Sequence, residues 1–179
     1  YLNEKYKDFN FNKISFSINH DSDFKAMDIS NDFKKFTIIH KSKKINIDLK
    51  AIGINNIYNS LCAASIASIL SIDLENIKVG LESFSGIENR FKILEYDNDN
   101  IVINDTYNAN PNSMLNALEM TNKIFPSKTK IAILGDMLEL GKIEKDEHEK
   151  LGINLVKNSF DRVFIYGNNY DNYKRGISG

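Results

Sequence analysis

The sequence lacks several features that mark common classes of protein. Its 179 residues include one cysteine, Cys62, so no disulfide can form within the chain, which excludes a cysteine-stapled secreted scaffold and favours a reducing compartment. No apolar run approaches the roughly 20 residues needed to cross a bilayer. Its 23 Lys and Arg residues nearly balance 24 Asp and Glu residues, which excludes a strongly basic nucleic-acid-binding chain and an acidic solvating tail.

The chain also lacks the signals that mark the start of many proteins. Residues 1–10 have neither the basic start nor the apolar stretch of a signal peptide. They do not include an initiating Met, and the chain stops soon after a strand-like segment. We therefore expect a cytoplasmic protein of which this sequence is an internal piece.

Three chemical motifs are absent as well. The string that comes nearest to a phosphate-binding P-loop fails, because five residues separate Gly135 from Gly141 and Ile143 stands where Ser or Thr must bind magnesium. No Gly-x-Gly-x-x-Gly follows a strand, which argues against a dinucleotide oxidoreductase. The sequence has no His/Cys cluster, so we expect no metal ligands in this chain, and it has no Gly-x-Ser-x-Gly string.

The pattern of apolar residues predicts two regions of different architecture. In the first region, apolar and polar residues alternate in short runs that predict antiparallel strands with one wet face. Two helices follow, one after Gly53 and one over residues 74–84. The predicted strands are residues 14–18, 25–29, 35–40 and 44–49.

The second region alternates strands with helices. After two strands that flank a turn, at 91–96 and 101–104, the predicted order is a helix over 111–124, a strand over 130–134, a helix over 145–157 and a strand over 162–166. Such an order is typical of a parallel sheet covered by helices. We predict an α/β chain with domains at residues 1–85 and 86–179, the second being an incomplete βαβ domain.

Polar residues that can carry chemistry gather at four places. The first is the helix after Gly53, where Asn56 and Asn59 lie three positions apart and share one face. A carboxamide presents a donor beside an acceptor, which is the pattern that grips the edge of adenine. The alternative, an N-cap at the helix start, explains one Asn but not two.

The second place is Arg90, one of three arginines in a chain that uses Lys for most of its positive charge. A guanidinium suits a pair of phosphate oxygens, and an Arg at a domain junction can reach into a cleft. The alternative is a surface ion pair, which the residues alone favour.

The third and fourth places each follow a predicted strand, where ligands of such sheets bind. Asp105 can accept the two hydroxyls of a ribose, and Tyr107 can lie against a base. Asn110 precedes Pro111, which is the arrangement of a helix N-cap with a first-turn proline. In the string 134–141, Asp136 and Glu139 are interpreted as cleft-lining groups. His148 is expected to face solvent and Cys62 to be buried.

Two of these strings together resemble the Mur ligases of peptidoglycan synthesis. They are Asp-Thr-Tyr-Asn-Ala-Asn-Pro at 105–111 and Leu-Gly-Asp-Met-Leu-Glu-Leu-Gly at 134–141, followed by His148-x-x-x-Gly152. Within that family they are most similar to the branch that adds a D-Ala-D-Ala dipeptide. The resemblance covers the chain from the first strands onward and is weak before Gly53.

The resemblance implies a fold and a set of ligands. Residues 1–85 would be the back part of a central ATP-binding domain of the P-loop type without its P-loop, and residues 86–179 an incomplete Rossmann-like C-terminal domain. ATP and Mg²⁺ would be the cofactors, with the magnesium ligands upstream of residue 1. The partners would be UDP-N-acetylmuramoyl-tripeptide and D-Ala-D-Ala, and we expect a monomer that binds no nucleic acid.

The resemblance also carries residue roles. The family's Gly-x-His-Asn-x-x-Asn string falls on residues 53–59, where Asn55 replaces its His, and its domain-opening Gly-Arg pair becomes Asn89-Arg90. The nucleotide-binding residues would be Asn56, Asn59, Arg90, Asp105, Tyr107 and Asn108. Arg90, which reaches the ATP phosphates in the family, would also be the catalytic residue. The substrate-binding residues would be Asn110, Asp136, Met137 and Glu139.

Two alternatives stay open. The first is another Mur-type or folylpolyglutamate-type ligase that adds a single amino acid, which an assay of the full-length protein with D-Ala-D-Ala and with single amino acids would separate. The second is a non-catalytic nucleotide-binding module derived from such a ligase, which an upstream region without a P-loop would favour.

Overall fold

The computed structural model describes residue 8 and residues 12–179, and the absence of a signal peptide was predicted from residues that lie mostly outside this part. The chain divides into two compact units, Tyr1–Ser85 and Gly86–Gly179, and each is described by itself. Among the described residues, no helix combines the length and apolar character needed to span a membrane.

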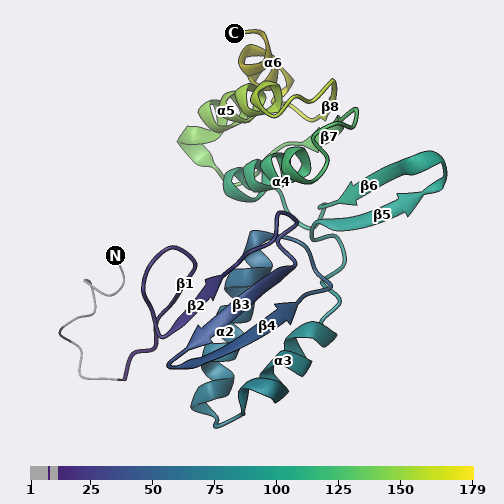
Figure 1. Ribbon diagram of the computed structural model, residues 1–179. Helices are drawn as coiled ribbons and strands as arrows, with labels where there is room; N and C mark the ends of the chain where they lie inside the picture. The colour runs from purple at the N-terminus through teal and green to yellow at the C-terminus, as the bar shows by residue number, and fades with distance from the viewer. Residues whose placement is uncertain (1–7, 9–11) are drawn as a thin grey trace. The chain divides into compact units, whose positions relative to one another are not determined.

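The first unit contains a four-stranded sheet in the order β1-β2-β3-β4 (Figure 1). Its strands are β1 (Phe16–Ser17), β2 (Phe24–Met27), β3 (Lys35–His40) and β4 (Lys43–Asp48). β2, β3 and β4 pair antiparallel, as the alternating pattern predicts, whereas β1 pairs parallel to β2. The parallel pairing at β1 corrects the prediction for that strand, because alternation in residues 14–18 indicates a strand but does not give the direction of its neighbour.

Two helices complete this unit, α2 (Ile54–Ile69) and α3 (Leu74–Ser83). Residues from β2, β3 and β4, among them Phe24 and Ile38, form one buried cluster with Ile57 and Leu61 of α2 and Ile77 of α3. The helices therefore cover one face of the sheet, and burial of these side chains holds the layers together. Cys62 is partly exposed instead of buried.

The second unit begins with a hairpin and a helix. β5 (Lys92–Tyr96) and β6 (Asn100–Asn104) pair antiparallel across a tight turn at Asp97–Asp99. α4 (Pro111–Ile124) follows with the bounds that the sequence predicts. The prediction of one parallel sheet is wrong for β6, because β6 pairs with β5 and belongs to a separate two-stranded sheet.

The rest of this unit is a βαβα segment. β7 (Ile131–Gly135) and β8 (Arg162–Tyr166) pair in parallel, and α5 (Glu144–Lys157) connects them. A final helix, α6 (Tyr170–Ser178), was not predicted from the sequence. A second buried cluster joins residues of α4, β7, α5 and α6, including Leu118, Ala132, Leu151 and Tyr173. The core of this unit therefore lies between the β7–β8 sheet and its helices.

Candidate functional site

A groove of about 450 Å³ lies between α2 and α3 in the first unit. Most of its lining is apolar, and it includes Leu49, Ala63, Ile77 and Phe84. The carboxamides of Asn56 and Asn59 also line it, so the face they share on α2 is turned to the groove. An apolar slot with a few amide groups is suited to a flat heteroaromatic ring.

Asn56 is not the N-cap of α2. That position is Gly53, at φ 122°, and no side chain caps the helix. The Nδ2 of Asn56 donates to the carbonyl oxygen of Ile52 at 2.8 Å, and its Oδ1 has no partner among the described residues. The N-cap explanation therefore fails for Asn56, and its acceptor oxygen is available to a ligand.

A third amide in the groove, Asn76 on α3, was not identified from the sequence. Its backbone N–H donates to Oδ1 of Asp73 at 2.9 Å, and its Nδ2 donates to Oδ2 at 2.7 Å. The bond to the N–H of Asn76 lowers the pKa of Asp73. Asp73 is the N-cap of α3. An Asp three residues before Asn76 is the pattern of an N-cap, and it could have placed Asn76 in the first turn of α3 from the sequence.

In the second unit, Arg90 and Tyr107 stack on each other. The Arg90 Cζ lies 4.0 Å from the centroid of the Tyr107 ring. The N–H of Tyr107 donates to the carbonyl oxygen of Asn89 at 3.0 Å, which ties the segment after β6 to the segment before β5. A stacked guanidinium keeps its N–H groups at its edge, where they can meet phosphate oxygens.

The backbone on both sides of Arg90 is strained. Asn89 has φ 61° and Phe91 has φ 45°, and a bulky aromatic residue at positive φ is uncommon. Asp105 holds this bend, because its Oδ1 accepts from the N–H of Phe91 at 2.9 Å. Asn104 adds a bond from its Nδ2 to Oδ1 of Asn89 at 3.0 Å. The bend fixes where Arg90 points, and it uses one of the two carboxylate oxygens of Asp105.

The next two candidates differ in their surroundings. Asn108 is exposed in the segment between β6 and α4. Asn110 is the N-cap of α4, with its Oδ1 accepting from the N–H of Ser113 at 3.0 Å and Pro111 at the first helical position. The N-cap prediction for Asn110 is confirmed, and its Oδ1 is occupied by this bond.

The string 134–141 forms the end of β7 and the loop after it. Asp136 accepts from the backbone N–H of Asn168 at 2.7 Å and of Asn169 at 3.2 Å, just before α6. Its carboxylate therefore binds amides at the start of a helix, which is a favourable place for negative charge. Glu139 is exposed at φ 64°. Asp136 has a structural task, whereas Glu139 is presented to solvent.

Two residues of this region are buried against expectation. His148 is 0% exposed, which contradicts the prediction that it faces solvent. It lies on the same face of α5 as Leu151 and Leu155, three and seven residues later, a helical spacing that the charged neighbours obscure. The Met137 side chain is also 0% exposed and packs in the core, so in this structure it offers no side-chain surface to a substrate.

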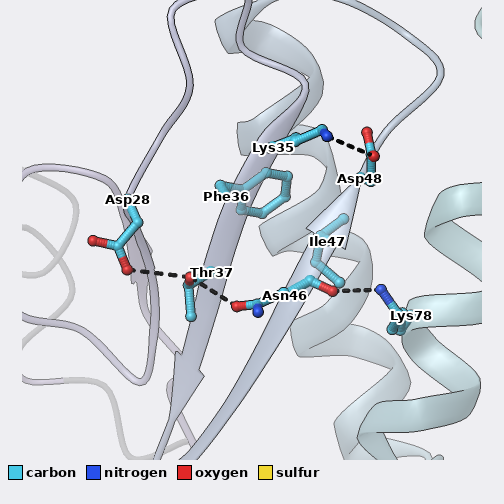
Figure 2. A pocket seen from close by; sticks show the side chains of 8 residues that line it. All are labelled: Asp28, Lys35, Phe36, Thr37, Asn46, Ile47, Asp48 and Lys78. Carbon is cyan, nitrogen blue, oxygen red and sulfur yellow. Dashed lines mark hydrogen bonds and ion pairs between the residues drawn. The ribbon is translucent and has the colours of Figure 1, made fainter.

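A second hollow, of about 390 Å³, lies over β3 and β4 in the first unit (Figure 2). Its polar groups bind one another. Thr37 contacts Asp28 and Asn46, Lys35 pairs with Asp48, and Lys78 donates to the backbone oxygen of Asn46. Because these groups satisfy one another, the hollow is a weaker ligand site than the groove.

Carboxylates, cysteines and histidines are not clustered for metal binding in the part of the chain that the structure describes, where no three of them form a candidate site. The candidate site residues thus fall into two groups. Asn56 and Asn59 meet in the groove of the first unit, and Arg90, Asp105 and Tyr107 meet beside the hairpin of the second.

Comparison with known proteins places the fold in a family. Residues 89–177 match the family described as "Mur ligase, glutamate ligase domain". The chain is 39% identical over 156 residues to the UDP-N-acetylmuramoyl-tripeptide--D-alanyl-D-alanine ligase of Buchnera aphidicola subsp. Baizongia pistaciae, an alignment that covers 86% of this chain and 34% of the relative. The chain belongs to the Mur ligase family.

Two further relatives show how much of this Mur ligase chain, and of each relative, the similarity covers. MurF from Acinetobacter baumannii superposes with a TM-score of 0.82 at 28% identity, covering 91% of this chain and 35% of that protein. The UDP-N-acetylmuramate--L-alanine ligase of Acetivibrio thermocellus is 39% identical over 113 residues, covering 60% of this chain and 24% of the relative. The chain thus spans about a third of the length of the curated relatives it matches.

Proposed function

We propose that this chain is part of an ATP-dependent ligase that joins D-Ala-D-Ala to UDP-N-acetylmuramoyl-tripeptide in the cytoplasm. The observation that carries the proposal is the extent of the match to the Buchnera ligase, which covers 86% of the chain and includes both units. The L-alanine ligase is equally identical but matches only 60% of the chain. Because of that match, a ligase that adds a single amino acid is the second candidate for the function of this protein.

In this proposal, residues 1–85 are the back part of the central ATP-binding domain and residues 86–179 belong to the C-terminal domain. The groove between α2 and α3 fits a purine, since its walls are apolar and Asn56 and Asn59 offer amide groups at its edge. Asn56 and Asn59 would therefore hold the adenine.

The second unit would bind the rest of the nucleotide. The guanidinium of Arg90 fits the phosphates, because Tyr107 and the strained bend beside it fix its direction. The second carboxylate oxygen of Asp105 is left for a ribose hydroxyl, since the first accepts from Phe91. Asn108 is exposed next to Tyr107 and completes this group.

The proposed reaction has two steps. ATP phosphorylates the terminal carboxylate of the tripeptide, which gives an acyl phosphate and ADP. The amine of D-Ala-D-Ala then attacks the carbonyl carbon, and phosphate leaves as the amide forms. Positive charge stabilises the phosphoryl group in transfer, and Arg90 is the residue of this chain assigned to that role. Mg²⁺ would add charge of the same sign, with its ligands upstream of residue 1.

The exposed part of the loop after β7 is assigned to the incoming dipeptide. Glu139 carries a negative charge into solvent at positive φ, and it is suited to the ammonium group of an amino acid or dipeptide. Met137 and Asp136 are retained as positions that shape this loop, because their side chains are engaged within the protein. Asn110 is retained in the same sense, as the cap of α4.

The test uses the full-length protein that contains this chain. ATP and Mg²⁺ are supplied with UDP-N-acetylmuramoyl-tripeptide or UDP-N-acetylmuramate as the acceptor and with D-Ala-D-Ala, L-Ala or D-Ala as the amine. Phosphate release and product mass are measured. The proposal expects turnover with D-Ala-D-Ala and the mass of the dipeptide adduct. Turnover with a single amino acid would assign the second candidate, and no ATP turnover with any amine would favour a non-catalytic module.

A further inference from the structure

The last residue of β7 and the first two residues of the loop after it are each held by hydrogen bonds to another part of the second unit. Tyr173 of α6 donates its hydroxyl to the carbonyl oxygen of Gly135 at 2.9 Å. Asp136 accepts from two amides of the segment before α6. The N–H of Met137 donates to Nε2 of His148, on α5, at 2.9 Å. Three consecutive residues are thus each bonded to a different partner.

We call Gly135, Asp136 and Met137 together with these partners the clamp, and His148 is its member on α5. Its Nδ1 lies 2.6 Å from the carbonyl oxygen of Glu144, one turn earlier in α5. That oxygen can only accept, so Nδ1 carries the proton and Nε2 is left as the acceptor for Met137. The ring packs edge-on against Tyr173 with centroids 5.0 Å apart. The ring is therefore held on both nitrogens and on one edge.

The loop changes character directly after the clamp. Met137 is buried, whereas Leu138 is 73% exposed and Glu139 is exposed with a left-handed backbone. The clamp thus ends at Met137, and the exposed tip of the loop, Leu138 and Glu139, begins directly after it. Holding an exposed tip in one conformation lowers the ordering cost that a ligand meets when it binds there.

We propose that His148 is a positioning residue for the amine substrate: its Nε2, by holding the N–H of Met137, sets the conformation in which Leu138 and Glu139 meet the incoming D-Ala-D-Ala. This inference rests on the proposed function, which assigns the loop to the dipeptide. His148 is buried and does not touch the substrate, so it acts through Met137. The positioning role therefore concerns binding of the amine substrate. The KM for ATP is unaffected, because the residues proposed to bind ATP are not part of this loop.

Two variants separate the two bonds of the ring. In H148N the amide nitrogen can still donate to the nearby carbonyl oxygen of Glu144, but the side chain is too short to accept from Met137. In H148Q the longer side chain brings an acceptor oxygen near the position of Nε2. We expect H148N to raise the KM for D-Ala-D-Ala by about fivefold, the loss that matches one net hydrogen bond. H148Q should recover most of that loss.

The readouts are kcat and the separate KM values for D-Ala-D-Ala and ATP, in the full-length protein. The proposal expects kcat and the KM for ATP to stay near wild type in both variants. An unchanged KM for D-Ala-D-Ala in H148N, or equal damage in H148N and H148Q, would overturn it. A wild-type protein that makes no D-Ala-D-Ala adduct would instead show that the proposed function is wrong.

A measurement on the wild-type protein covers the case in which H148N does not fold. Amide hydrogen exchange is followed at Met137 and Leu138. The clamp requires slow exchange at Met137, whose N–H is bonded to a buried ring, and fast exchange at Leu138, which the bond does not include. Equally fast exchange at the two positions would overturn the positioning role whether or not the enzyme is active.

Discussion

The guanidinium of Arg90 lies on the ring of Tyr107, 4.0 Å from its centroid, across the segments that precede β5 and follow β6. The contact joins residues that are distant in sequence, and it occurs where the backbone is strained at Asn89 and Phe91. Strain of this kind is retained where the surrounding bonds over-determine it, and it is typical of functional sites. Arg90 is therefore a residue held in place before any ligand arrives.

The stacking predicts a ranking of variants at these two positions. Y107A should raise the KM for ATP by about two- to fivefold, because an exposed cation–π contact is worth about 0.5–1 kcal/mol. Y107F keeps the ring and should match wild type. R90K keeps the charge but loses the planar fork, and should raise the KM by about tenfold or more. Steady-state kinetics of the full-length enzyme measures all three, and equal values for Y107A and Y107F would contradict the stacking role.

Asp105 should show two separable roles. D105A removes the acceptor for the N–H of Phe91 and should cost about 1–2 kcal/mol of unfolding free energy. D105N retains an acceptor oxygen, so it should keep most of the stability while weakening ATP binding. Denaturant unfolding gives the first quantity and nucleotide titration the second. Equal losses of stability in D105A and D105N would show that the bond to Phe91 contributes little.

Asn59 and Asn55 provide a matched pair for the groove. Both are exposed residues of α2, but only Asn59 lines the groove. An Asn→Ala change improves helix propensity similarly at both positions. N59A should raise the KM for ATP by about fivefold, the effect of one lost hydrogen bond, and reduce the preference for ATP over GTP. N55A should leave both quantities unchanged, and an equal effect of the two variants would remove the groove from the nucleotide site.

Tyr173 predicts a loss of stability at alkaline pH. Burial and, secondarily, the nearby charge of Asp136 raise the pKa of its hydroxyl well above its ordinary value of 10.0. The unfolded chain therefore releases this proton at a lower pH than the folded chain, and stability falls as pH rises above about 10, by up to about 1.4 kcal/mol per pH unit. Y173F should abolish this contribution, at a cost of about 1 kcal/mol at neutral pH for the bond to Gly135.

The measurement for Tyr173 is the free energy of unfolding between pH 8 and pH 11. The wild-type protein should lose stability relative to Y173F across the upper part of this range. Parallel pH profiles for the two proteins would show that Tyr173 ionises equally in the folded and unfolded chains.

Gly176 lies where α6 packs tightly against α5. A Cβ at Gly176 would collide with the backbone of Glu149 and Ile153, which cannot move away as a side chain could. G176A should therefore cost about 3 kcal/mol or more of unfolding free energy. Gly80, inside α3, has nothing within 4 Å of its Cβ position, so G80A should stabilise by about 0.5–1 kcal/mol. Thermal unfolding measures both, and a neutral G176A would contradict the close packing.

Much of the local structure could be read from the sequence. Alternation of apolar residues located β3 and β4, and a helical spacing located α2 and α4. These patterns are reliable because one face of each element is buried and the period of burial is the period of the backbone. Asn56 and Asn59 were found in the same way, because residues three positions apart in a helix lie on the same face.

The partners of these residues were decided by the tertiary structure. β6 could have joined a parallel sheet, but the short turn after β5 makes the antiparallel hairpin. His148 sits among charged residues in sequence, yet it is buried because α6 and the loop after β7 close over that face of α5. The sequence by itself determined most of the helices and strands, though not α6, and the chemical side chains that they carry. Only the packing of distant segments decided that Asp105 bends the backbone beside Arg90 and that His148 holds Met137, because such bonds depend on spatial closeness and have no sequence period.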